Sequence, residues 1–311
     1  MRGEADVVPR GTVGKIIAVC NQKGGVGKTT SAVNLASALA LEGVRVLLLD
    51  LDPQANATGG LGVEKRTIER SIYQALLEAI PLESVVLKTQ IENLWLVPCQ
   101  VALSGAEVEL VALPERELRL KFLLQSIRSE YDLILIDSPP SLGLLTVNAL
   151  AASDSVMIPL QCEYYALEGL SQLLETIRMV QGSLNPGLMI EGILLTMADF
   201  RTRLTTDVIE EVRRFFGSKV YDVVIPRSVR LSEAPSRGLP IALYDPHSSG
   251  AQAYRLLGLK IKETLHVGDS RSGERNTGSD PGGDNSVTAG SSQGSPSGNQ
   301  VESIPAPQKP E

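Results

Sequence analysis

The amino-acid sequence predicts an α/β fold in which a doubly wound, mostly parallel sheet carries helices on both faces. Short, almost continuous apolar runs alternate along the chain with longer stretches of helical periodicity. Strands of a parallel sheet are buried on both faces, so they read as unbroken apolar runs, and helices form the crossovers between them. The 311 residues are 43% hydrophobic, which is sufficient for a substantial core. We therefore expect one globular domain at residues 14–266, without an internal repeat.

The expected elements follow one another in regular alternation. Each predicted strand is a short, mostly apolar run, and these runs lie at 16–20, 44–49, 94–97, 133–136, 155–160 and 190–195. Helical stretches are expected among them at 29–41, 115–129, 167–180 and 205–216. This order of strand, helix and strand is typical of a sheet that is wound in both directions from its centre.

The two ends of the chain differ from this pattern. Residues 1–13 form an N-terminal extension, and residues 267–311 are rich in Gly, Ser, Pro and Asn with almost no large apolar side chain. Such a composition predicts a disordered tail. Residues 268–311 contain six acids and three bases, a net charge of −3, so −4 of the total −7 belongs to the rest of the chain. The acidic total therefore does not exclude a nucleic-acid partner.

Several classes of protein are disfavoured by composition. No uninterrupted apolar run reaches about 18 residues, and residues 1–15 lack the apolar segment of a secretory signal, so we expect a cytoplasmic protein. Cys20, Cys99 and Cys162 are widely spaced without a C-x-x-C pair, which predicts buried thiols rather than disulfides or a zinc site. His247 and His266 are the only histidines, so the sequence has too few histidines to favour a histidine-based metal site or nucleophile.

The strongest local signal is a glycine-rich turn between the first strand and the first helix, in the segment IIAVCNQKGGVGKTTSAVNLASAL. Strand, loop and helix N-terminus are the context that a phosphate-binding loop requires. Glycines at 24, 25 and 27 let successive N–H groups point inward at phosphate oxygens, and the helix dipole adds to the attraction. The loop expected to bind a nucleoside triphosphate consists of Lys23, Gly24, Gly25, Val26, Gly27, Lys28 and Thr29.

Side chains at the start of that helix have separate expected roles. Lys28 would neutralise the β- and γ-phosphates of ATP, and Thr29 would supply a hydroxyl ligand directly to Mg²⁺. Thr30 adds a donor for the α-phosphate region.

Three aspartates close apolar strands. Asp50 and Asp52 end the second strand with i, i+2 spacing, and ligands of doubly wound sheets collect at this edge. Asp137 ends the run YDLILID and is followed by Ser-Pro-Pro, which is a Walker B arrangement. Because Mg²⁺ gives up its hydration shell reluctantly, we expect Asp137 to hold it through water.

The phosphate loop departs from the general Walker A pattern. Gln22 occupies the position of the first glycine, and a second lysine, Lys23, follows it. This arrangement resembles the deviant Walker A motif of the ParA/MinD family of ATPases. The resemblance implies that Lys23 reaches across a dimer interface to the partner's phosphates, so that a homodimer forms around ATP. It also implies that Asp52 orients the attacking water and that Asp50 helps to organise the magnesium shell.

Later segments resemble the ParA/Soj chromosome-partitioning branch, and the similarity covers nearly all of residues 14–262. They are PLQCEYYALEGLSQL, LLTMADFRTRLTTDVIEEV and VIPRSVRLSEAPSRGLPIALYDPHSSGAQAY. The resemblance implies that Pro226 and Ser228 contact adenine, although Ser228 stands where the branch usually has asparagine. The segment 198–200 also departs from the usual tyrosine-aspartate pattern, while Arg201 is retained.

The same resemblance implies non-specific binding of double-stranded DNA by the ATP dimer and slow hydrolysis stimulated by a ParB-like protein, at the nucleoid. Residues 199–240 contain eight bases and six acids, a net charge of +2. Arg201 and Arg230 are the two that we expect to contact DNA. Dimerisation would double the phosphate contacts and hence the sensitivity to salt.

Three alternatives follow from the shared loop. A MinD-like membrane switch should end in a basic amphipathic helix, but residues 252–266 carry few bases, so no stable membrane association is expected. A nitrogenase-iron-protein-like reductase needs two cluster-ligating cysteines, and Cys99 and Cys162 lack glycine-rich settings. A non-enzymatic nucleotide sensor is the third alternative, and measurable ATP turnover would exclude it.

Overall fold

The computed structural model describes residues 13–163 and 168–273. Its centre is one seven-stranded sheet with strand order β3-β4-β2-β5-β1-β6-β7. The strands are β1 Lys15–Val19, β2 Val46–Asp50, β3 Leu87–Lys88, β4 Leu94–Val97, β5 Leu133–Asp137, β6 Ser155–Gln161 and β7 Met189–Thr196. All pairings are parallel except β3 with β4. The predicted fold class is therefore confirmed.

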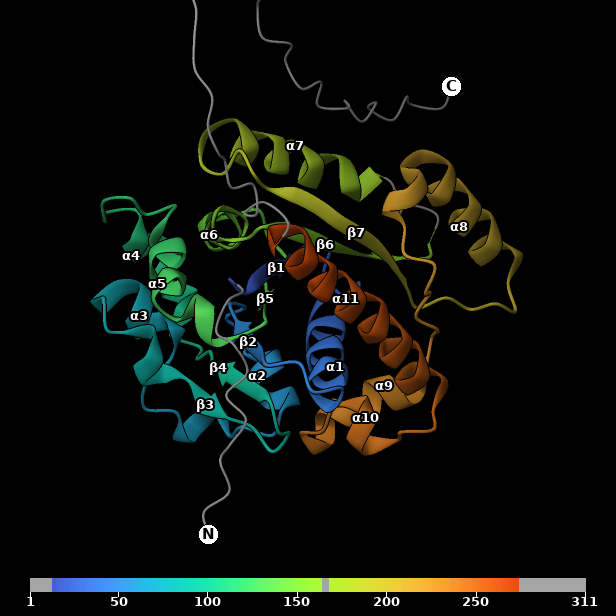
Figure 1. Cartoon of the computed structure of the whole chain (residues 1–311), viewed down its shortest axis with the longest axis horizontal. Coiled ribbons are helices and arrows are strands. Elements are labelled where there is room, and N and C mark those ends of the chain that lie inside the picture. Colours follow the sequence, from blue (N-terminus) through green and yellow to red (C-terminus); the bar gives the residue numbers. More distant parts are fainter. Residues whose placement is uncertain (1–12, 164–167, 274–311) are drawn as a thin grey trace, which may run out of the picture.

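Helices cover both faces of this sheet (Figure 1). They are α1 Lys28–Leu41, α2 Asn56–Gly60, α3 Ile72–Glu78, α4 Leu103–Leu110, α5 Arg119–Ile127, α6 Leu144–Ala152, α7 Glu168–Ser183, α8 Arg203–Phe216, α9 Val229–Glu233, α10 Ile241–Tyr244 and α11 Ser249–Gly273. None of the helices in the described ranges is both long enough and apolar enough to cross a membrane.

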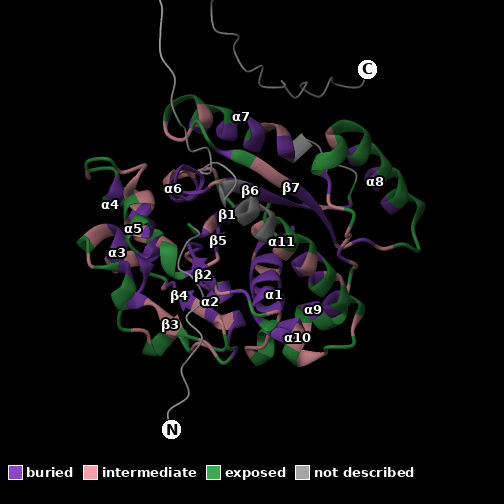
Figure 2. Cartoon of the chain, viewed as in Figure 1, coloured by how far each residue is buried: buried purple, intermediate pink, exposed green. Residues whose placement is uncertain are grey.

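Alternate strand residues belong to two separate hydrophobic cores. In β1, Ile16 and Ala18 join a cluster with α3 to α8, whereas Ile17 and Val19 join one with α1 and α9 to α11. Successive side chains of a strand point to opposite faces, so every strand except the two-residue β3 contributes to both cores. Figure 2 shows the resulting buried centre, with exposed residues on the outer helix surfaces. Cys20, Cys99 and Cys162 are buried free thiols, as predicted.

One predicted helix boundary is wrong. The helix expected at 115–129 begins only at Arg119, because Glu115 has a φ of 50° in the left-handed region, which no helix residue can adopt. Helix α11 runs to Gly273, and the expected end of the domain at residue 266 stays a prediction. The expected N-terminal extension, except residue 13, and the tail beyond residue 273 lie outside the described residues.

Helices α1 and α11 pack against each other on one face of the sheet. The Ser31 and Tyr254 hydroxyls lie 3.0 Å apart within this contact, and both residues are buried. A Cβ built on Gly258 would lie 3.4 Å from the Ala38 Cβ, which is ordinary close packing. The contact holds α1, which begins at the glycine-rich loop, firmly in place.

This packing gives the first prediction. Leu257 on α11 is fully buried, whereas its neighbour Leu256 is 56% exposed. Leu257→Ala should lower the free energy of unfolding by about 2–5 kcal/mol because it removes buried methylenes and leaves a cavity. Leu256→Ala, the matched control, should change it by less than about 0.5 kcal/mol. Urea unfolding followed by circular dichroism measures both, and equal losses would contradict this assignment of the α11 face.

Candidate nucleotide site

The glycine-rich loop leads from β1 into α1, at the carboxyl end of the central strands. Gly25 and Gly27 have φ angles of 75° and 88°, a left-handed conformation that favours glycine. Gly27 is also the N-cap of α1 and has no side-chain capping hydrogen bond. The first N–H groups of α1 therefore have no capping side chain, which leaves them available for an anion.

Two side chains that the sequence analysis missed brace this loop. The Asn21 amide donates to the Pro159 carbonyl at 2.7 Å and accepts from the Lys23 N–H at 3.0 Å. The Thr196 hydroxyl, at the end of β7, donates to the Val26 carbonyl at 2.8 Å. These polar residues at strand ends tie the loop to the sheet. Nothing in the sequence around Asn21 or Thr196 distinguishes them from other polar residues at strand ends.

Lys28 is buried beneath the loop. Its exposed fraction is 6%, and its ammonium group donates to the Lys23 carbonyl at 3.0 Å. Burial lowers the Lys28 pKa, while the charges of Asp137 and Asp52 act in the opposite direction. The charges of Asp137, at the end of β5, and of Asp52, two residues beyond β2, therefore both act on this cation.

Asp50 and Asp137 lie side by side, because β2 and β5 pair with these two residues in register. Both are fully buried. One Asp50 oxygen accepts from the Thr58 N–H and hydroxyl, each at 2.7 Å, and the other accepts from the Asp52 N–H at 3.3 Å. Burial raises the Asp50 pKa to about 6, against these hydrogen bonds. Asp50 thus holds α2 against the sheet.

The Asp137 carboxylate is different. Neither of its oxygens has a hydrogen-bond partner in the described part of the chain. Burial and then the charge of Asp50 raise its pKa well above the ordinary value, while the Thr29 hydroxyl and Lys28 lower it. A buried carboxylate without a partner, close to a threonine hydroxyl, fits a hard cation such as Mg²⁺.

This donor set is too small to form a closed metal cage. Within the described residues, no group of three or more His, Cys, Asp or Glu side chains could hold a metal ion. Sites in which Mg²⁺ binds together with substrate phosphates usually use only one or two carboxylates. Asp137 and Thr29 fit such a site, whereas the Asp50 oxygens already accept three hydrogen bonds.

Asp52, which follows β2, and Lys23, the first residue of the loop, both have partners within the chain. Asp52 is 6% exposed and accepts from the Gln54 N–H at 2.9 Å. The Lys23 ammonium group forms an ion pair with Glu163 of the same chain at 3.1 Å, and both side chains are about half exposed. The roles in water activation and across a dimer interface that were expected for these residues stay predictions.

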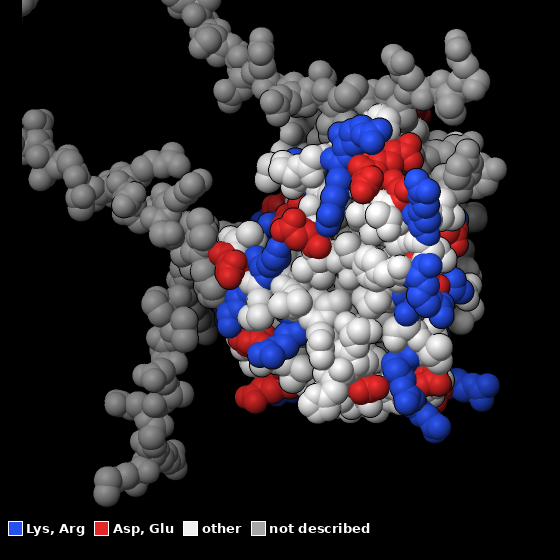
Figure 3. Space-filling view, turned by 90° about the vertical axis from the view of Figure 1, so that its right-hand side faces the viewer, with Lys and Arg blue, Asp and Glu red and all other residues white. Residues whose placement is uncertain are grey.

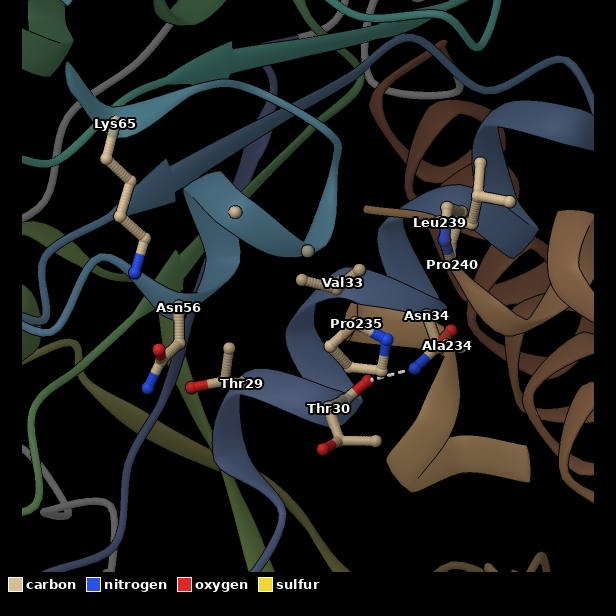
Figure 4. A pocket seen from close by; sticks show the side chains of 12 residues that line it. Thr29, Thr30, Val33, Asn34, Asn56, Lys65, Ala234, Pro235, Leu239 and Pro240 are labelled. Atoms are coloured by element: carbon tan, nitrogen blue, oxygen red, sulfur yellow. Dashed lines mark hydrogen bonds between the residues drawn. The ribbon is translucent and has the colours of Figure 1, made fainter. Parts of the chain in front are cut away.

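A cavity of about 410 Å³ adjoins the start of α1. Figure 4 shows Thr29 and Thr30 at its edge, with Asn56 and Lys65 on one side and Pro235 on the other. Pro226 and Ser228 are not among its lining residues. Pro226 instead pairs with Ala198 beside the end of β7, and Ser228 precedes α9. Their expected contact with adenine stays a prediction.

The two arginines expected to bind DNA are already paired. The Arg201 guanidinium makes two bonds to Asp199, the shorter at 2.7 Å, and Arg230 lies 3.1 Å from Glu233 and 3.4 Å from Asp245. Four other exposed arginines have no ion pair in the described ranges: Arg213, Arg214, Arg227 and Arg237. Figure 3 shows bases and acids interleaved around an uncharged centre on one side of the molecule.

A braced glycine-rich loop, a buried lysine and a partnerless aspartate on the adjacent strand define a phosphate-loop nucleotide-binding protein. Comparisons with known proteins narrow this class. The AAA domain family matches residues 14–190. Soj, the sporulation initiation inhibitor protein of Bacillus subtilis (strain 168), is 60% identical over 242 residues, which are 78% of this chain and 96% of that protein. The chromosome partitioning protein ParA of Myxococcus xanthus (strain DK1622) is 56% identical over 80% of this chain and 88% of that protein.

Solved structures agree with the fold. Cobyrinic acid a,c-diamide synthase from Mycobacterium smegmatis, with bound ADP and magnesium, superposes with a TM-score of 0.73 at 36% identity, covering 82% of this chain and 96% of that one. The septum site-determining protein MinD from Pyrococcus horikoshii OT3, complexed with Mg-ADP, gives 0.67 at 26% identity over 81% and 98%. The chain belongs to the ParA/Soj family of chromosome-partitioning ATPases, as the sequence motifs predict.

The partnerless carboxylate gives the second prediction. The folded-state pKa of Asp137 lies above its ordinary value of 3.8, so the folded protein holds a proton that the unfolded chain loses as pH rises from that value. Stability therefore falls across that range, and Asp137→Asn removes the effect. The variant should be more stable than the parent at pH 8, by on the order of 1–3 kcal/mol, and the difference should shrink toward pH 4. Urea unfolding without nucleotide tests this, and a pH-independent difference would contradict it.

Proposed function

We propose that this chain is a dimerising switch ATPase of DNA segregation, which binds and hydrolyses ATP with Mg²⁺. The observation that carries the proposal is the buried Lys28 beside the partnerless Asp137 at the end of a braced phosphate loop. A phosphate group would replace the Lys23 carbonyl as the partner of the Lys28 ammonium. The names of the relatives, which are chromosome-partitioning proteins, support the same role.

Each group at this site has a distinct task in hydrolysis. The N–H groups at the start of α1 and Lys28 hold the β- and γ-phosphates, and Thr29 and Asp137 would hold Mg²⁺. When bound, the metal ion would neutralise part of the phosphate charge. Asp52 accepts a hydrogen bond from the attacking water and fixes its position, because phosphoryl transfer depends mainly on positioning and charge stabilisation. Thr30 adds a donor for the α-phosphate, and Pro226 and Ser228 contact the adenine.

Dimerisation depends on Lys23. Its ion pair with Glu163 is about half exposed on both sides, and exposed pairs contribute only about 0–1 kcal/mol. A triphosphate in a partner subunit is a stronger attraction for this lysine, because it carries several negative charges in a partly buried interface. The homodimer therefore forms only with ATP, and hydrolysis separates the subunits.

A MinD-like membrane-positioning ATPase is the alternative, and the described part of α11 argues against it. Three bases lie on residues 249–265 of the helix, and all three are attached to the body of the protein. Arg255 pairs with Glu42 at 3.0 Å, Lys260 pairs with Asp222 at 2.6 Å, and Lys262 donates to the Glu42 carbonyl. A membrane-binding helix needs its bases free for anionic lipids. We propose a cytoplasmic, nucleoid-associated protein without stable membrane association.

Removal of Asp52 gives the third prediction. Asp52→Ala should leave ATP binding intact and slow turnover by at least about a hundredfold, so that the ATP dimer accumulates. A fluorescent ATP analogue, phosphate release and multi-angle light scattering measure the three properties. Lys28→Ala is the non-binding control, and Lys23→Ala combined with Asp52→Ala should bind ATP without dimerising. Normal turnover in the Asp52 variant would remove this residue from the mechanism.

DNA binding by the ATP dimer rests on Arg201 and Arg230. The two guanidinium groups are exposed, with the Arg201 side chain at 87% and the Arg230 side chain at 57%, so the phosphates of DNA can compete with their partly buried acidic partners. A dimer presents each arginine twice, and the unpaired arginines near them add to the positive electrostatic potential of the surface. Stimulation of hydrolysis by a ParB-like protein would release the DNA.

The fourth prediction is a salt series with DNA of unrelated sequence. Binding should require ATP and weaken steeply with salt, and Arg230→Ala should reduce the slope of log affinity against log salt by about 2 per dimer. Arg70→Ala changes an exposed arginine on the loop before α3 and serves as the control. Fluorescence anisotropy with ATP, with ADP and without nucleotide measures the affinity. An unchanged slope in the Arg230 variant would exclude that residue from the interface.

A further inference from the structure

A carboxylate of helix α4 lies against the end of the loop that follows Asp137. Glu107, on α4, lies against Gly143, which is the residue before α6. Its Oε1 accepts from the Leu145 N–H at 3.4 Å. A Cβ built on Gly143 would overlap this carboxylate, with the Glu107 Cδ only 2.9 Å away. The contact therefore requires a residue without a side chain at position 143.

This carboxylate replaces the missing cap of α6. Gly143 has no side chain to cap the helix, and no acidic residue stands in the first turn. A negative charge near a helix N-terminus is favourable because the free N–H groups there carry partial positive charge. Glu107 supplies that charge from a different element, so it fixes α6 and α4 relative to each other.

The loop between Asp137 and α6 touches the nucleotide site. Ser138 donates from its hydroxyl to the Val19 carbonyl at 2.9 Å, and Thr146 donates to the Ser141 carbonyl at 2.7 Å. Pro140 lies next to Gly24 of the phosphate loop, 4.0 Å from the place of a Cβ there. The near end of the loop is thus tied to the sheet, its middle is tied to α6, and Glu107 fixes its far end.

We propose that Glu107 is a positioning residue for ATP hydrolysis, which acts by anchoring the segment from Ser138 to Gly143 beside the phosphate loop. The inference rests on the proposed hydrolysis of ATP. Helix α4 is a firm support, because Leu103, Ala106 and Leu110 are fully buried. Without the anchor, the loop keeps its hydrogen bonds at Ser138 and Ser141 but loses the contact at its far end. Turnover should suffer more than ATP affinity, because Lys28 and the α1 N–H groups are held by other contacts.

Two substitutions break the same contact from opposite sides. Glu107→Ala removes the carboxylate, and Gly143→Ala adds a methyl group in its place. The Gly143 backbone has a φ of −76°, which alanine adopts freely, and the Glu107 carboxylate can swing outward. Each variant should lower kcat for ATP hydrolysis about ten- to a hundredfold with KM changed less than about threefold. The double variant should be no slower than the slower single one.

Matched controls separate positioning from general damage. Glu109→Ala removes another glutamate of α4, one that accepts from the Tyr73 hydroxyl at 3.1 Å, and should leave kcat unchanged. Glu107→Gln keeps an oxygen for the Leu145 N–H and should recover part of the rate. Hydrogen exchange of the amides in residues 144–147 should accelerate in Glu107→Ala and Gly143→Ala but not in Glu109→Ala.

Each outcome decides the proposal. Unchanged kcat in Glu107→Ala, additive losses in the double variant, or an equal loss in Glu109→Ala would overturn it. A parent protein that does not hydrolyse ATP would refute the proposed function itself, and the exchange measurement would still report whether Glu107 holds α6.

Discussion

The structure depends on how charge is balanced where β2 and β5 end side by side. Two fully buried aspartates meet there in register, and isolated buried charges cost several kcal/mol each. Asp50 is stabilised by three hydrogen bonds, two of them from Thr58. Asp137 has only the neighbouring Thr29 hydroxyl and Lys28 to offset its burial. This imbalance makes one carboxylate a structural anchor for α2 and leaves the other available to a cation.

The sequence predicted the parts of the site that consist of contiguous residues. The phosphate loop, the strand ends at Asp50 and Asp137, and the six longer strands all follow from local patterns, because burial and backbone conformation act over a few residues. Strand β3 was missed, since two residues carry no periodicity. The helix expected at 115–129 was placed too early, because its left-handed Glu115 has no signal in a single sequence.

Contacts between distant residues were beyond sequence reasoning. Thr196 and Val26 are separated by 170 positions, and Lys23 and Glu163 by 140. Such pairs are brought together by the strand order, which places β6 beside β1 and β7 beside β6. The arginines show the same limit. Arg201 was expected to contact DNA because the related family retains an arginine at this position. Its bidentate ion pair with Asp199, two residues away, became evident only from the structure.

The contact between Glu107 and Gly143 also bears on how this protein can change over evolutionary time. A side chain at 143 is incompatible with the carboxylate in its observed position, and the three atoms nearest to such a side chain all belong to Glu107. Substitutions at these two positions are therefore coupled, although they are 36 positions apart in the chain. In an alignment of related chains, the pair should vary together, with larger residues at 143 accompanying the loss of the acid at 107 and a new capping residue at the start of α6.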